Sequence, residues 1–167
     1  MGQWSLKERL QPSLLDRLTD LQPDKTKESS SQQVLSQKQF KEAVIRDLAW
    51  LLNTTSLDSV IDLSAFPEVR RSVLNYGMPD ISGHTSHSID TANLEKSLQR
   101  VIYEFEPRII HNSLKVTVHS NPDDMNHNSL VFAIEGVVFG QPMPFQVVLR
   151  SELDLECGQF NLREDLT

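Results

Sequence analysis

The spacing of apolar residues changes at Pro107, and this change limits the folds open to the chain more than any other feature. Before Pro107, apolar side chains recur every three or four residues, as on one face of an α-helix. After it, Leu114, Val116 and Val118 alternate with polar residues, as along a strand with one buried face. Helices followed by strands predict an α+β fold, with N-terminal amphipathic helices packed on a three- to four-stranded antiparallel C-terminal sheet.

Two long helices and a short one are expected before Pro107. Ser36 and Gln39 have the spacing of a capping box, which predicts a helix over about 37–53. Pro67 suits a first helical position and Gly77 suits a helix end, so a short helix is expected over 68–76. The apolar face of the last helix consists of Leu94, Leu98, Val101, Ile102 and Phe105.

Three strands of a meander and a short fourth strand are expected after Pro107. The second and third alternating stretches cover residues 130–134 and 145–149, and polar turns at 121–128 and 140–144 precede them. Cys157-Gly158 is a turn sequence, which allows a last strand around 160–162 to pair with the third.

Composition shifts divide the chain into four segments. Residues 1–21 contain an amphipathic helix that is too short to be stable alone, and residues 22–34 are polar and serine-rich, which predicts a flexible linker. We expect a single α+β domain over 35–163 and a tail over 164–167. The N-terminal helix is therefore expected to be tethered to the domain and not embedded in it.

The charge balance argues against nucleic acid as a partner. The chain has 23 Asp and Glu against 16 Lys and Arg, a formal charge of −7, which repels a phosphate backbone. The single cysteine, Cys157, excludes an intramolecular disulfide and a thiolate zinc site. Without a signal peptide pattern or a long apolar run, we expect a soluble, intracellular protein with no direct membrane insertion.

No motif with a defined catalytic mechanism is present, so we expect neither an enzyme nor a cofactor. His84 and His87 lack an obvious third metal ligand, and the acidic run at 123–126 lacks the spacing of a calcium loop. Glu104 and Glu106 could be tested as the two carboxylates of a glycosidase. Two residues apart on a helix is about 200° of rotation, which points them away from one another.

The tripeptide Glu106-Pro107-Arg108 stands where the period changes. Pro107 fixes its own φ, so the flanking carboxylate and guanidinium leave a stiff corner. Arg108 can make bidentate contacts with a carboxylate of a partner protein. The alternative is an internal role, in which these charges tie the helix end to the sheet or to Arg70, Arg71 or Asp80.

Several segments in this order resemble the TssE subunit of the type VI secretion baseplate and, more distantly, the lysozyme-like wedge proteins of contractile phage tails. The segments are 14–18, 44–53, 67–80, 105–108 and 152–158, which together extend over nearly the whole chain.

The resemblance implies a structural wedge subunit that is cytoplasmic and assembled at the inner face of the cell envelope. It would join the baseplate core, built with TssF and TssG in the same assembly as TssK, to the contractile sheath proteins TssB and TssC. The implied core contact motif is the Glu-Pro-Arg tripeptide, and the N-terminal helix is a further candidate. The expected partner-binding residues are Glu106, Pro107, Arg108, Leu14, Leu15, Arg17 and Leu18.

Two further expectations follow from the resemblance. Sheath contact would use β-strand addition at a free sheet edge, unless the N-terminal helix covers that edge or Lys115 protects it. Arg108→Ala should leave the circular dichroism spectrum intact and abolish co-purification with TssF and TssG. The lysozyme-like label leaves a peptidoglycan-degrading hydrolase as the alternative function.

Overall fold

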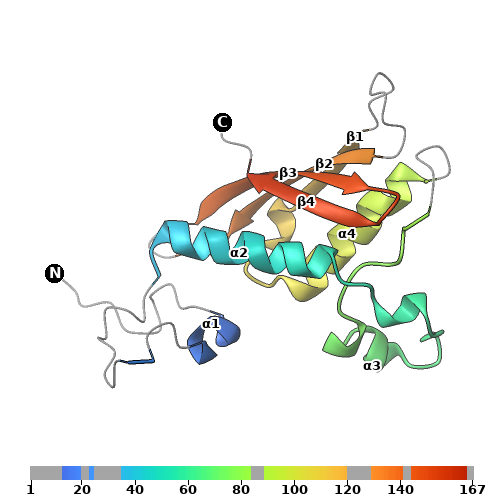
Figure 1. Cartoon of the computed structure of the whole chain (residues 1–167), viewed down its shortest axis with the longest axis horizontal. Coiled ribbons are helices and arrows are strands. Elements are labelled where there is room, and N and C mark those ends of the chain that lie inside the picture. Colours follow the sequence, from blue (N-terminus) through green and yellow to red (C-terminus); the bar gives the residue numbers. More distant parts are fainter. Residues whose placement is uncertain are drawn as a thin grey trace.

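The computed structural model describes residues 13–19, 23–24, 35–83, 89–119, 129–140 and 144–164. Helices come first and strands follow, so the predicted α+β class is confirmed (Figure 1). The helices are α1 Leu14–Leu18, α2 Gln37–Leu52, α3 Pro67–Arg70 and α4 Thr91–Phe105, with short 3₁₀ turns η2 Leu57–Ser59, η3 Val73–Asn75 and η4 His111–Ser113. The strands are β1 Lys115–His119, β2 Ser129–Val138, β3 Phe145–Asp154 and β4 Gln159–Glu164.

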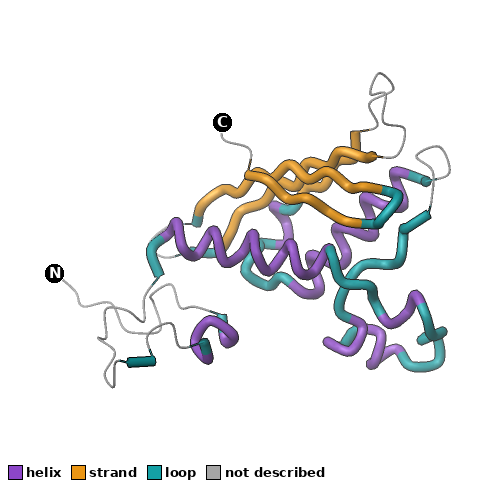
Figure 2. The backbone as a smooth tube through the Cα atoms, viewed as in Figure 1, coloured by secondary structure: helices purple, strands orange, loops and turns teal. Residues whose placement is uncertain are grey.

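The four strands form one antiparallel meander in the order β1-β2-β3-β4. Burial alternates along β2 and β3, so that one face of the sheet is covered and the other is open. Figure 2 shows α2 and α4 on the covered face, with α2 passing beneath β4. Phe132, Leu149, Leu48, Leu98 and Ile102 are among the fully buried side chains between these two layers. The core is therefore a helix layer on a sheet layer.

Local sequence fixes the ends of both long helices. The Ser36 side chain accepts from the Gln39 backbone N–H, and the Gln39 side chain accepts from the Ser36 backbone N–H, which confirms the capping box of α2. Asp90 caps α4 by accepting from the backbone N–H groups of Ala92 and Asn93. At the other end, α4 stops at Phe105 and Glu106 is its C-cap, because Pro107 follows.

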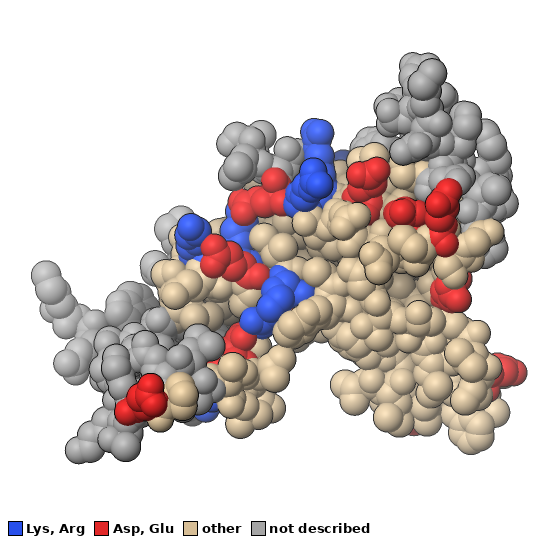
Figure 3. Space-filling view, in the orientation of Figure 1, with Lys and Arg blue, Asp and Glu red and all other residues tan. Residues whose placement is uncertain are grey.

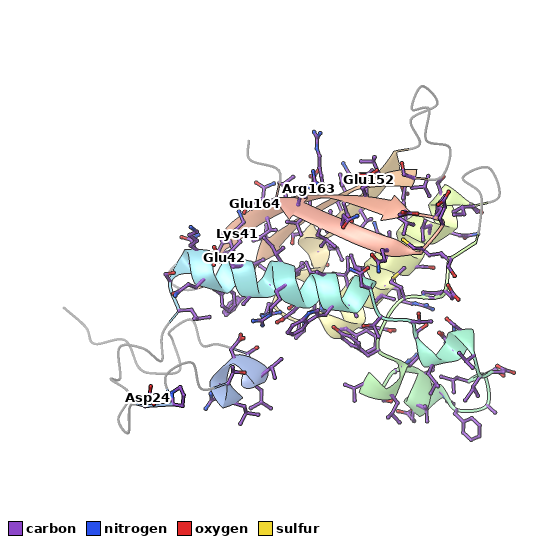
Figure 4. The ribbon with its side chains drawn as sticks, viewed as in Figure 1. Asp24, Lys41, Glu42, Glu152, Arg163 and Glu164 are labelled. Carbon is purple, nitrogen blue, oxygen red and sulfur yellow. The ribbon has the colours of Figure 1, made fainter. Side chains whose placement is uncertain are left out.

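Helix side chains occupy part of each sheet edge. At β4, the Asn53 side chain accepts from the Phe160 backbone N–H (2.8 Å) and donates to the Phe160 carbonyl (3.0 Å). At β1, the Glu95 carboxylate accepts from the Val118 backbone N–H at 2.7 Å. Lys41 of α2 and Glu164 of β4 also form an ion pair, and Figure 4 shows the two side chains pointing toward each other. These contacts limit uncontrolled strand pairing at both edges.

Residues 54–79 form a side lobe that projects away from the sheet (Figure 1). The single helix expected over 68–76 is wrong: α3 ends at Arg70, and η3 begins at Val73. Ser72 separates them, because its backbone is extended and its hydroxyl caps Leu74 and donates to the Val69 carbonyl. Gly77 has φ 124° and lies against the Thr54 carbonyl, so a side chain there would collide with the backbone.

The N-terminal helix, α1, is short and buries none of its residues. It lies beside α2, away from the sheet (Figure 1). Most of the expected linker over 22–34, the turn over 121–128 and the last three residues of the tail lie outside the described residues. No helix in the described part of the chain is long and apolar enough to cross a membrane.

Candidate functional site

The Glu106-Pro107-Arg108 corner joins the helix layer to the sheet. After Pro107, the Arg108 carbonyl accepts from the Phe139 backbone N–H at 2.7 Å, and the Ile110 N–H donates to the Val137 carbonyl at 2.8 Å. The corner is therefore bonded on one side to α4 and on the other to the end of β2. This placement agrees with the position expected from the change of period.

Arg108 bridges two carboxylates, Glu106 at the C-cap of α4 and Asp47 within α2. Its Nε donates to Oε1 of Glu106 at 2.6 Å, and its Nη2 donates to Oδ2 of Asp47 at 2.7 Å and also to Oε2 of Glu106. Glu106 is only 3% exposed. The internal partner from another element is thus Asp47 of α2, and not Arg70, Arg71 or Asp80, the partners that the sequence suggested.

The network of ion pairs extends from Asp47 to the N-terminal helix, α1. Arg46 donates to Oδ1 of Asp47 through Nε (2.9 Å) and Nη2 (2.7 Å). Its other contacts are with Asp16 of α1, at 2.6 Å from Nη1 and 3.2 Å from Nη2. A ladder of alternating charges, Glu106-Arg108-Asp47-Arg46-Asp16, therefore connects α4, α2 and α1. We call these five residues the charge ladder.

The ladder changes the acid–base properties of its members. The hydrogen bond from Arg46 lowers the pKa of Asp16. Burial alone would lower the pKa of Arg108, but the hydrogen bonds and charges of Glu106 and Asp47 outweigh it and raise that pKa. Burial raises the pKa of Tyr76, and the nearby charges of Asp47 and Glu106 add to the rise. The lowered pKa of Asp16 and the raised pKa of Arg108 both favour the charged forms of these two residues.

A groove of about 420 Å³ lies between the corner, α1 and α2. Figure 3 shows the molecule hollowed beneath α2, between α1 and the side lobe. The Arg46 guanidinium lies over the Trp50 ring at 4.8 Å, and the Tyr76 and Phe105 rings meet edge to face. The groove is lined by Ser13, Leu15, Asp47, Trp50, Leu51, Tyr76, Phe105, Glu106, Pro107 and Arg108.

Comparison with known protein families matches residues 38–143 to the family described as baseplate wedge protein gp25. The match covers more than half of the chain and includes α2, the side lobe, α4 and the Glu-Pro-Arg corner. The chain belongs to this family. No curated protein and no solved structure matches the chain significantly.

As a member of this family, the chain is a structural baseplate protein and interacts with other baseplate proteins. The wedge family also agrees with the resemblance found in the sequence. The matched region contains four members of the charge ladder, while Asp16 and the rest of α1 precede it.

The structure brings some, but not all, of the expected partner-binding residues of the wedge protein together. Leu15, Glu106, Pro107 and Arg108 line one groove. Leu14, Leu18 and Arg17 are exposed on α1 but do not line it. Sequence reasoning did not single out Asp47, Arg46 or Asp16. An Arg-Asp pair on the polar side of a predicted helix was the available signal, but such pairs are common on solvated helix surfaces.

The two carboxylates considered for glycoside hydrolysis have different surroundings in the wedge protein. Glu106 is buried against Arg108, whereas Glu104 lines a second pocket on the side-lobe side of Phe105. No group of three metal-ligating side chains occurs among the described residues. His84, His87 and the acidic run at 123–126 lie outside those residues.

Proposed function

We propose that the chain is the type VI secretion wedge subunit that joins the baseplate core to the contractile sheath and supports sheath assembly. The groove at the helix-to-sheet junction carries this proposal, because it combines an exposed apolar lining with walls held by partly buried ion pairs. Rigid walls reduce the entropy lost when a partner segment binds. The core partners are TssF and TssG, within the assembly that contains TssK.

In this proposal the corner holds the groove in shape, and its charged side chains do not bind the partner directly. Glu106 is buried, and Arg108, whose side chain is 21% exposed, already bridges Glu106 and Asp47. Pro107 and Trp50 remain exposed and offer an apolar contact. A partner segment inserted here would contact Pro107, Trp50 and Leu15 and leave the charge ladder in place.

The sheath contact with TssB and TssC is proposed at a sheet edge. An added strand needs free backbone N–H and C=O groups. The side chains of Asn53 at β4 and Glu95 at β1 now hold some of these groups, so strand addition would have to displace one of them or begin beyond it. Neither α1 nor Lys115 is the protecting group in these contacts.

The core contact is tested by replacing an exposed aromatic residue in the groove. Trp50→Ala should abolish co-purification with TssF and TssG while the chain stays folded, with only a modest fall in the unfolding midpoint, since Trp50 is 47% exposed and its ring stacks against Arg46. Tyr103→Ala is the matched control, because Tyr103 is an aromatic residue that is 52% exposed on α4 outside the groove.

Equal recovery of TssF and TssG with wild type and Trp50→Ala would contradict the proposed docking groove. Loss of both partners with Tyr103→Ala as well would show that the effect is not specific to this site.

A further inference from the structure

The two walls of the groove are held with different strength. One wall is the corner, where Arg108 makes hydrogen bonds with buried Glu106 and with Asp47 of α2. The Arg108 carbonyl also accepts from the Phe139 backbone N–H, which ties this wall to the end of β2. Because these bonds join α4, α2 and the sheet in one network, the packing of the domain fixes the corner wall.

The opposite wall is α1, which contributes nothing to the buried core. None of its residues is buried, and its leucines, Leu14, Leu15 and Leu18, are all more than half exposed. A helix of five residues has little stability of its own. Apolar burial within the described structure therefore does not drive the docking of α1 on the domain.

The last step of the charge ladder places α1 beside α2. Asp16 accepts from both terminal nitrogens of Arg46, at 2.6 Å and 3.2 Å, and the Ser13 hydroxyl donates to the same carboxylate at 2.8 Å. The side chains of Asp16 and Arg46 are 23% and 36% exposed, so water reaches this ion pair. Such a pair is weak, and α1 can leave its place and return without unfolding of the domain.

Arg46 does not need Asp16 to keep its own position. It also donates to Oδ1 of Asp47 from Nε at 2.9 Å and from Nη2 at 2.7 Å. Its guanidinium lies over the Trp50 ring, 4.8 Å from the centroid. The domain thus keeps a formed receiving site for Asp16, even when α1 is away from it.

We propose that α1 is a clamp, which opens to admit a partner segment into the groove and closes over it. In the closed state Leu15 contacts the segment, and Asp16 is paired with Arg46. The inference rests on the proposed function, because the clamped segment is that of the core partner. A clamp acts after the segment has entered, so it slows dissociation and changes association little.

Asp16→Lys tests the clamp, because the new charge repels Arg46 and releases α1. Binding of the full chain to the purified TssF–TssG complex is followed by biolayer interferometry. The dissociation rate should rise about tenfold, since an attractive pair becomes repulsive. The association rate should stay within about twofold of wild type. The melting temperature should stay within about 2 °C of wild type, because α1 is not part of the core.

Asp24→Lys is the matched control. It makes the same change in net charge on an exposed residue that precedes the domain, and Figure 4 shows Asp24 apart from α2. Its dissociation rate should equal that of wild type.

The position of α1 can also be measured without the partner. Spin labels at Thr19→Cys and Glu42→Cys, both exposed, report the separation of α1 and α2 by pulsed electron paramagnetic resonance in a Cys157→Ser background. The free chain should give a broad distance distribution, and the complex should give one narrow peak at short distance. Asp16→Lys should shift the distribution of the free chain to longer distances.

Two groups of outcomes separate the clamp from the groove that it would close. Equal dissociation rates for wild type and Asp16→Lys, or equally fast dissociation of Asp24→Lys, would overturn the clamp while Trp50-dependent binding still supported the groove. A free-chain distribution as narrow as that of the complex would overturn it as well, by showing that α1 is a fixed wall. Wild-type affinity of Trp50→Ala would instead contradict the proposed docking groove, and the clamp with it.

Discussion

Arg108 is the residue on which the corner depends. It sits between a buried carboxylate, Glu106, and a partly buried one, Asp47; it compensates the charge of Glu106, whereas Asp47 is shared with Arg46. Removal of one partner from such an arrangement leaves uncompensated charge in a poorly solvated place, which costs more than the intact pair contributes. Truncation of Arg108 is therefore expected to reduce the stability of the protein, even where the circular dichroism spectrum of the folded state is unchanged.

Arg108→Ala should lower the free energy of unfolding by about 3 kcal/mol. Arg108→Lys should lose less, because it keeps the charge but cannot serve both carboxylates as a planar guanidinium does. Urea denaturation followed by circular dichroism measures both changes. A loss below about 0.5 kcal/mol for Arg108→Ala, the size expected at an ordinary surface site, would show that the bridge is not structurally important.

The corner could be located from sequence, but its partner could not. Pro107 and the change of apolar period identify a helix-to-sheet junction by local rules alone. Asp47 lies 61 positions before Arg108, and the pairing depends on how α2 packs beside α4. Charged residues at the surface of one amphipathic helix do not reveal which other element they will meet.

Among the helices and strands, those features that nearby residues determine could be predicted, and those that depend on tertiary packing could not. The capping box of α2, the end of α4 at Pro107 and the order of the four strands depend on nearby residues, and the structure confirms them. The helix expected over 68–76 fails because Ser72 prefers to cap η3, and because Gly77 must lie against the Thr54 carbonyl. Among the described residues, the ion pair between Asp16 and Arg46 ties α1 to α2, and no sequence pattern predicts this pairing.

The contact between α1 and α2 should depend on pH. The pKa of Asp16 is lowered in the folded state by the hydrogen bond from Arg46. Because the pKa of Asp16 is lower in the folded state than in the unfolded state, its ion pair stabilises the contact fully when the pH is above the unfolded-state pKa. This stabilisation is lost as the pH falls below about 4. The amide NMR signals of Arg17 and Thr19 should then shift toward random-coil positions.

Asp16→Asn is the control for this titration. Its amide can still accept a hydrogen bond but carries no charge, so the α1 signals should be insensitive to pH in this range. Wild-type signals that do not change on acidification would show that the ion pair does not hold α1.

At the scale of the whole molecule, α1 contributes to the partner-binding groove but not to the buried core. α1 buries none of its residues, and a partly exposed ion pair between Asp16 and Arg46 ties it to the domain. Deletion of residues 1–24 should therefore change the free energy of unfolding by no more than about 1 kcal/mol. The same deletion should reduce co-purification with TssF and TssG, because Ser13 and Leu15 form one wall of the groove.

Thermal denaturation and a pull-down on the same preparation test both halves of this prediction. A large fall in the melting temperature would contradict it by showing that the segment is part of the folding unit. Full partner recovery would leave α1 without a role in docking.

The charge ladder also predicts how related sequences should vary. Each interior member, Arg108, Asp47 and Arg46, is shared between two neighbours of opposite sign. A reversed charge at one of these positions creates two like-charge contacts, so a single compensating change cannot restore the ladder. Among homologues, these positions should therefore be substituted together or not at all, and the terminal position, Asp16, should vary most freely.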